Sequence, residues 1–206
     1  MRRSKAYVVG IGGPVGAGKT TLVNCLCTEM RDEYSIGVIV NDIHGPHDAR
    51  YLQGVRVLET ARIFSVVTGR VKRKIFRQNE DLNRQAVRQL SKRYDDIDII
   101  FIEGVGDRMD SRFCHSLVNY FIYIIDSTDG ECLPLKGGFG IKKSELLVVN
   151  KVDLLDPKKG RLGRLSLNIQ KVRGTRTYVL AALERGLGVN HIARAIKKDL
   201  LKYKST

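Results

Sequence analysis

A glycine-rich stretch near the N-terminus constrains this chain more than any other feature. It reads Gly13-Pro14-Val15-Gly16-Ala17-Gly18-Lys19-Thr20 and matches the pattern G-x-x-x-x-G-K-[ST]. The apolar run from Ala6 to Ile11 precedes it as a predicted buried strand, and Thr20 to Arg31 follows it as a predicted helix. Glycines let successive backbone N–H groups converge on an anion at the positive end of such a helix. The stretch therefore predicts a loop that binds the phosphates of a nucleoside triphosphate.

The residues at the end of this loop have distinct expected roles. Lys19 is expected to reach the β and γ phosphates, and the Thr20 hydroxyl is expected to coordinate Mg²⁺. We expect the loop to hold Lys19 at the surface rather than pack it in the core. The predicted nucleotide contacts here are Gly13, Pro14, Val15, Gly16, Ala17, Gly18, Lys19, Thr20 and Thr21.

Apolar runs alternate with helix-period segments along the 206 residues. The predicted strands are Ala6 to Gly12, Ile36 to Val40, Ile97 to Ile102, Tyr120 to Ile125, Leu146 to Val149 and Thr177 to Leu180. The predicted helices are Thr20 to Arg31, Glu80 to Arg93, Leu162 to Val172 and Asn190 to Lys202. Uniformly apolar strands between helices indicate a mainly parallel sheet covered on both faces. We expect residues 1–206 to form one α/β P-loop domain.

Ligands of such sheets bind beyond the carboxyl ends of the strands, so the loops there are expected to surround one nucleotide. Residues from Gly45 to Lys74 show only weak periodicity and carry many charges. We interpret this region as a mobile segment beside the site.

Charge and cysteine content narrow the choice of partners and compartment. Lys and Arg total 36 against 22 Asp and Glu, a formal charge of +14, which favours acidic partners without identifying one. No aromatic ladder accompanies the basic runs, so nucleic acid is not expected to be the partner. No window is apolar over the roughly 20 residues of a membrane span. We expect a cytoplasmic protein with reduced cysteines, Cys25 and Cys27 being small core residues.

A second motif, Asn150-Lys151-Val152-Asp153, follows the predicted strand Leu146 to Val149. It matches N-K-x-D, and an aspartate can accept hydrogen bonds from both N1–H and the exocyclic amino group of guanine, which adenine does not offer together. Lys151 is expected to pack its stem on the base, and Asn150 to tie the two loops together. The motif favours guanine over adenine.

With these motifs in view, the chain resembles the urease accessory GTPase family from about Val8 to the C-terminal helix. The resemblance also includes Asn41-Asp42-Ile43, Asp98 to Glu103, Gly106-Asp107, Tyr123 to Asp126 and Lys136 to Ile141. It implies one P-loop domain, Mg²⁺ and GTP binding with slow hydrolysis, a GTP-dependent homodimer, and nickel delivery to urease with other accessory proteins.

The resemblance also assigns individual residues. Asp42 approaches magnesium together with Thr20 and Glu103. Apart from the resemblance, the needs of phosphoryl transfer lead us to expect that Glu103 or Asp107 orients the attacking water. Asn150 and Asp153 hold guanine. The family has a small polar pair at the ribose and base edge where this chain has Ala181-Ala182, so backbone amides, that of Ala182 included, are expected to serve there.

Two departures bear on the metal chemistry. The family's Cys-Pro-His nickel motif falls on Val71-Lys72-Arg73, which offer no suitable ligands. A glutamate that helps the family to hold magnesium aligns with Val67, and Glu59 replaces it only if two compensating gaps are introduced. The departures favour weak or absent nickel binding and a monomer or salt-dependent dimer.

Two readings of function remain open. One is a GTP-hydrolysing maturation factor of the urease accessory type. The other is a GTP-dependent interaction module that docks an acidic partner through Arg70 to Lys74 without handling metal. Any nickel ligands would have to come from His44, His47, Cys114, His115 and Cys132, whose spacing matches no standard metal motif.

Overall fold

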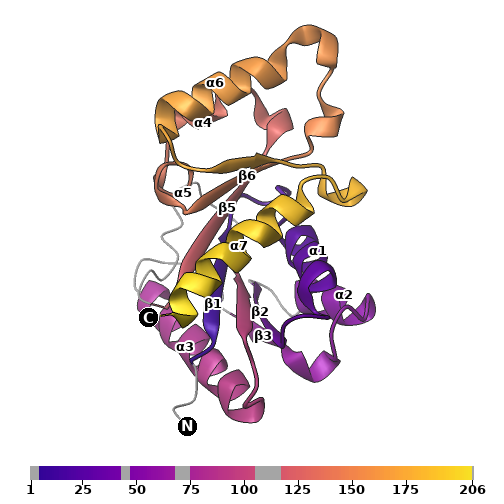
Figure 1. Cartoon of the computed structure of the whole chain (residues 1–206), viewed down its shortest axis with the longest axis vertical. Coiled ribbons are helices and arrows are strands. Elements are labelled where there is room, and N and C mark those ends of the chain that lie inside the picture. The colour runs from indigo at the N-terminus through magenta and orange to yellow at the C-terminus, as the bar shows by residue number, and fades with distance from the viewer. Residues whose placement is uncertain (1–4, 43–46, 68–74, 105–116, 206) are drawn as a thin grey trace.

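Seven strands form one sheet at the centre of the structure (Figure 1). The computed structural model describes residues 5–42, 47–67, 75–104 and 117–205, and for Asp42, His47 and 75–79 only the backbone. The strands are β1 (Tyr7–Gly12), β2 (Ile36–Asp42), β3 (Ile63–Val67), β4 (Ile99–Glu103), β5 (Tyr120–Asp126), β6 (Leu146–Asn150) and β7 (Tyr178–Leu180). All neighbouring strands run parallel in the order β3-β2-β4-β1-β5-β6-β7. The predicted α/β fold class is confirmed.

Helices cover both faces of this sheet. They are α1 (Lys19–Met30), α2 (His47–Gly54), α3 (Ile75–Arg93), α4 (Leu133–Lys136), α5 (Phe139–Lys143), α6 (Arg161–Arg173) and α7 (Val189–Lys204). The described residues also form five 3₁₀ turns in the connections between strands and helices: η1 (Thr60–Arg62), η2 (Ser127–Asp129), η3 (Val152–Leu154), η4 (Pro157–Lys159) and η5 (Leu183–Arg185). Among the described residues, no helix is both long and apolar enough to cross a bilayer.

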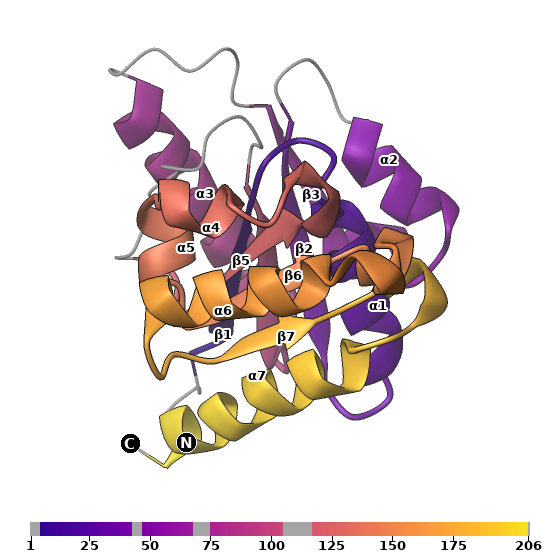
Figure 2. The same ribbon diagram turned by 90° about the horizontal axis from the view of Figure 1, so that it is seen from above.

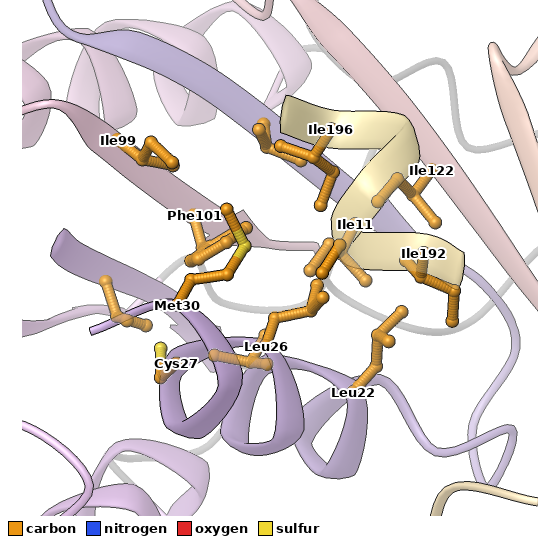
Figure 3. Close-up of a cluster of buried hydrophobic side chains, with 14 of the residues drawn as sticks. Ile11, Leu22, Leu26, Cys27, Met30, Ile99, Phe101, Ile122, Ile192 and Ile196 are labelled. Carbon is orange, nitrogen blue, oxygen red and sulfur yellow. The ribbon is translucent and has the colours of Figure 1, made fainter. Parts of the chain in front are cut away.

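One face of the sheet packs against α1, α2 and α7, and the other packs against α3 to α6. The helices α7 and α1 lie on one side of the strands, and β7 passes between α6 and α7 (Figure 2). On the first face, Leu22, Leu26 and Met30 recur every four residues along α1 and are fully buried. They point toward β1 and β4 on one side and toward Ile192 and Ile196 of α7 on the other (Figure 3). This packing fixes α1, and with it the loop from β1.

The described part of the region 45–74 contains two elements that were not predicted, α2 and the edge strand β3. In β3, Ile63 and Val66 are buried while Ser65 and Val67 are exposed. Ile63 packs on the α2 side of the sheet and Val66 on the α3 side, so this edge strand is only partly covered on each face. Its signal in the sequence is the pentapeptide Ile63 to Val67, in which three residues are β-branched. The helix α3 also begins at Ile75, five residues before the predicted start at Glu80. Cys27 is buried as predicted, and Cys25 is only partly buried.

Candidate functional site

The phosphate loop fits closely between β1 and the ends of the neighbouring strands. Gly13 has a φ of 154°, and a Cβ built on it would lie 2.3 Å from the backbone oxygen of Ile124 in β5. Gly18 has a φ of 98°, and its Cβ would lie 2.5 Å from Nδ2 of Asn150. Both positions therefore require glycine for conformation and for space. The loop therefore packs against β5 and β6, and the second motif begins at Asn150, the last residue of β6.

The N-terminus of α1 has no side-chain cap and no acidic residue, which favours binding of an anion. Its N-cap is Gly18, which supplies no side-chain cap, and its first turn contains no acidic residue. The first backbone N–H groups of a helix have no partner within the helix, and the helix dipole places partial positive charge at that end. The N-terminus of α1 is therefore open to a phosphate oxygen.

Lys19 is folded back onto this loop. Its side chain is buried, with 9% of the residue exposed, and Nζ donates a hydrogen bond to the Pro14 backbone oxygen at 3.1 Å. We expected the loop to hold Lys19 at the surface, and in this structure the loop covers it. Burial lowers the pKa of Lys19, while the negative charges of Glu103 and Asp48 act in the opposite direction. Lys19 therefore lies where an arriving anion would relieve the cost of its burial.

The proposed magnesium residues converge at the same edge of the sheet. The Thr20 hydroxyl donates a 2.7 Å hydrogen bond to Oε1 of Glu103, whose residue is 2% exposed. A hydroxyl and a carboxylate this close are ligands that a hard cation such as Mg²⁺ accepts, so the residues present fit the ion. Asp42 is the last residue of β2 and pairs in register with Val67, so its backbone also lies at the carboxyl edge. The structure does not describe the Asp42 side chain.

The two positions considered for an additional magnesium ligand lie at opposite ends of the sheet. Val67 ends β3 beside Asp42 and is 55% exposed, but it has no ligating atom. Glu59 precedes η1 and lines a groove with Ser35 and Asp98, which come just before β2 and β4. That groove is at the amino edge of the sheet. Its position argues against Glu59 as a substitute for the family's glutamate.

A buried pair of side-chain amides contacts the backbone of Glu103, one of the proposed magnesium residues. Asn41 and Asn83 exchange hydrogen bonds of 3.0 and 2.8 Å through their side-chain amides. The Asn41 amide nitrogen also donates to the backbone oxygen of Glu103 at 2.8 Å. These bonds connect α3 to the ends of β2 and β4. The sequence placed Asn41 beside the site, but it contained no signal that Asn83 would pair with it.

Asn150 bridges the two motif loops. Its side-chain nitrogen donates to the Ala17 backbone oxygen at 2.9 Å, and its side-chain oxygen accepts from the Leu183 backbone N–H at 3.1 Å. The residue is only 4% exposed. The geometry matches the expected tie between the phosphate loop and the N-K-x-D loop.

The neighbouring Lys151 is held at both its backbone and its ammonium group. It has a φ of 63°, and its backbone oxygen accepts from the Ser127 hydroxyl at 2.9 Å. Its Nζ lies 2.5 Å from Oδ2 of Asp126, the last residue of β5. Burial acts to raise the pKa of Asp126, but hydrogen bonds from Lys151 and Thr128 outweigh it and leave that pKa below its usual value. The lysine stem is therefore fixed at one end by an ionised carboxylate.

The predicted guanine reader, Asp153, forms an ion pair that the sequence did not suggest. Its Oδ2 lies 2.9 Å from Nε of Arg185 in η5. The backbone N–H groups of Ala181 and Ala182 donate to the oxygens of Val149 and Leu187. The two amides assigned to the ribose and base edge are thus already bonded within the protein here.

Most of the remaining candidate site residues lie outside the part of the chain that the structure describes. Asp107, His44, Cys114, His115 and the segment Val71-Lys72-Arg73 lie outside the described residues. For His47 only the backbone is described, and Cys132 is exposed. Within the described part of the chain, no three His, Cys, Asp or Glu side chains are grouped as a metal site.

A glycine-rich loop before an uncapped helix, with its lysine and a threonine-carboxylate pair beside it, defines a P-loop nucleotide-binding protein. The sequence matches the family described as CobW/HypB/UreG, nucleotide-binding domain, over residues 7–179, and the chain belongs to this family.

Solved structures share the fold. The hydrogenase maturation factor HypB from Archaeoglobus fulgidus has a TM-score of 0.73 at 20% identity, covering 97% of this chain and 92% of that one. HypB from Helicobacter pylori, in complex with nickel, has a TM-score of 0.71 at 18% identity, covering 96% and 88%. An LAO/AO transport system kinase gives 0.59 at 16% identity, covering 98% and 60%. These matches do not favour the urease accessory protein over HypB within the family.

Proposed function

We propose that this chain binds GTP with Mg²⁺, hydrolyses it slowly, and uses the cycle to assist the maturation of a metalloenzyme. One observation carries the nucleotide assignment: the buried Asn150 side chain, at the start of the N-K-x-D motif, joins the phosphate loop at Ala17 to the loop after β7 at Leu183. We call the N-K-x-D loop and the loop after β7 together the base loop. The two loops are therefore held at a fixed separation before any nucleotide arrives, as a site for one nucleotide requires. Family membership and the HypB-like fold support the maturation role.

The residues divide the work of phosphoryl transfer between them. Lys19 and the amides of the loop neutralise charge on the phosphates, Lys19 exchanging Pro14 for a phosphate oxygen. Thr20 and Glu103, together with Asp42, would hold Mg²⁺, which supplies further charge neutralisation when bound. Glu103 or Asp107 orients the attacking water. Little covalent chemistry is required of the protein, because positioning and charge stabilisation dominate this reaction.

The guanine preference is tested by calorimetric titration of the wild type with GTP, GDP and ATP in the presence of Mg²⁺. We expect GTP and GDP to bind far more tightly than ATP, because hydrogen bonds to a charged group contribute about 1.5–3 kcal/mol each. Asp153→Asn is expected to weaken GTP binding. Asp156→Asn is the matched control, since Asp156 only caps the nearby turn η4. Equal affinities of the wild type for GTP and ATP would overturn the assignment.

The proposal also concerns the metalloenzyme that is matured, which we call the client, and the metal that is delivered to it. A nickel enzyme, urease or hydrogenase, is the client class that the resemblance and the two HypB neighbours suggest. The second candidate, a GTP-dependent interaction module, is favoured by Val71-Lys72-Arg73, where cations stand in place of thiolate and imidazole. The resemblance implies that this position lies at the face where two copies meet, so association driven by GTP would bring these charges together and disfavour a tight homodimer at low salt.

Nickel titration with and without GTP separates the two candidates. A tight, stoichiometric nickel site that depends on GTP supports metal delivery and excludes the module. Absence of nickel binding, together with a GTP-dependent complex with an acidic client, supports the module. In the double variant Val71→Cys and Arg73→His, the appearance of nickel-linked dimers would show that only the ligands separate this chain from a nickel carrier.

A further inference from the structure

Arg185 contacts the side chain that is proposed to read guanine. Its Nε lies 2.9 Å from Oδ2 of Asp153. The Asp153 side chain is 21% exposed and that of Arg185 is 72% exposed, so the carboxylate is largely covered while the guanidinium lies at the surface. Ala181 and Ala182, the other residues placed at this edge, have no side-chain donor. Within the described part of the chain, Arg185 supplies the ion-pair partner of this carboxylate.

The backbone fixes both partners before a ligand binds. On one side, the Val152 N–H donates to the Ala181 oxygen at 3.1 Å, and the Leu154 N–H closes η3 on the Lys151 oxygen. On the other side, the Arg185 N–H donates to the Ala182 oxygen at 2.9 Å. Ala182 and Leu187 also form an antiparallel bridge around η5. The ion pair thus joins two closed turns.

We propose that Arg185 is a positioning residue for base recognition, holding the Asp153 carboxylate in the orientation in which guanine binds. The inference rests on the proposed function and adds a residue to it. A carboxylate has two oxygens and about four lone-pair sites, so one contact at Oδ2 leaves acceptors for the two N–H groups of guanine. Holding the rotamer in advance removes the entropic cost of ordering it when the base binds.

The pairing also discriminates between bases. The ion pair helps only a ligand that uses Asp153, and adenine does not present the required donor pair. Loss of Arg185 should therefore reduce the preference for GTP over ATP. A contribution from general charge attraction would change the binding of both triphosphates alike, because they carry the same phosphates.

Titrations of GTP and ATP into the variants test this. For Arg185→Ala we expect about a two- to fivefold loss of GTP affinity, the range typical of an exposed ion pair, and unchanged ATP affinity. Arg185→Glu, which places a second carboxylate beside Asp153, is expected to lose about tenfold or more for GTP. Arg185→Lys keeps the charge without the guanidinium and should not restore the full preference. Arg194→Ala, an exposed arginine of α7, is the control and should change neither affinity.

A double-mutant cycle tests whether Arg185 acts on GTP binding through Asp153. In the Asp153→Ala background, Arg185→Ala is expected to have no further effect on GTP binding, because its partner is gone. Unchanged or tighter GTP binding by Arg185→Ala overturns the inference, as does an equal loss for GTP and ATP. These results differ from failure of the proposed function, in which the wild type itself shows no preference for GTP.

Discussion

Replacement of Asn150 by alanine should affect stability and nucleotide binding together. Its side chain satisfies two buried backbone groups, the Ala17 oxygen and the Leu183 N–H, at 2.9 and 3.1 Å. A buried polar group left without a partner costs about 1–3 kcal/mol. We therefore expect Asn150→Ala to lower the free energy of unfolding of the nucleotide-free protein by about 3 kcal/mol. For a chain of this size, that corresponds to a fall of roughly 6–12 °C in Tm.

The same variant should bind GTP less tightly, because the phosphate and base loops would no longer be held together. Thermal unfolding without nucleotide gives the first quantity, and calorimetric titration of GTP gives the second. Asn168→Ala is the control: its amide also donates to a backbone oxygen, that of Glu131 at 3.0 Å, but between α6 and the segment just before α4. The control should lose some stability and keep its GTP affinity.

Asn150→Asp separates the two bonds. Aspartate can still accept from Leu183, but it offers no N–H to Ala17 and brings a negative charge toward that oxygen. We expect it to bind GTP as poorly as the alanine variant. A Tm within 2 °C of the wild type and an unchanged GTP affinity in Asn150→Ala would refute the bridging role.

Three further predictions concern single side chains. Lys19→Ala should abolish GTP binding or hydrolysis without lowering Tm, because the wild-type lysine is buried at a cost; a variant that hydrolyses GTP like the parent contradicts this. Since the pKa of Asp126 is lowered in the folded state, its contribution is present above about pH 4 and is lost as pH falls through the folded pKa. Acid unfolding should therefore show a smaller pH dependence in Asp126→Asn. Arg173→Met should lower stability by at least about 3 kcal/mol in denaturant unfolding, because the buried guanidinium donates to oxygens of Ile141, Ser144 and Thr177; a loss below 1 kcal/mol would contradict that role.

Secondary structure was predictable where one periodicity dominated. Strands such as β1, buried at every residue, show as continuous apolar runs, and α1 shows a repeated apolar face. The edge strand β3 was missed because, among the described strands, it pairs with β2 alone, and two of its five side chains are exposed. Its five residues are too few for an apolar run to stand out from the charged segment around them.

The sequence by itself determined the fold class and the two motif loops, because these depend on residue type and spacing along the chain. Glycines at 13 and 18, Lys19 and the Asn150 to Asp153 motif all have a local meaning that is independent of distant partners. It also placed both motifs at strand ends, and the parallel sheet then brings those ends to one edge.

Only the tertiary structure decided which side chains meet at that edge. The contact of Asn150 with Ala17 spans 133 residues, and that of Asn41 with Asn83 spans 42. The burial of Lys19 and the pairing of Arg185 with Asp153 likewise follow from the packing of separate loops. Hydrogen bonds and ion pairs form wherever the fold brings a donor close to an acceptor, and sequence spacing does not encode that distance.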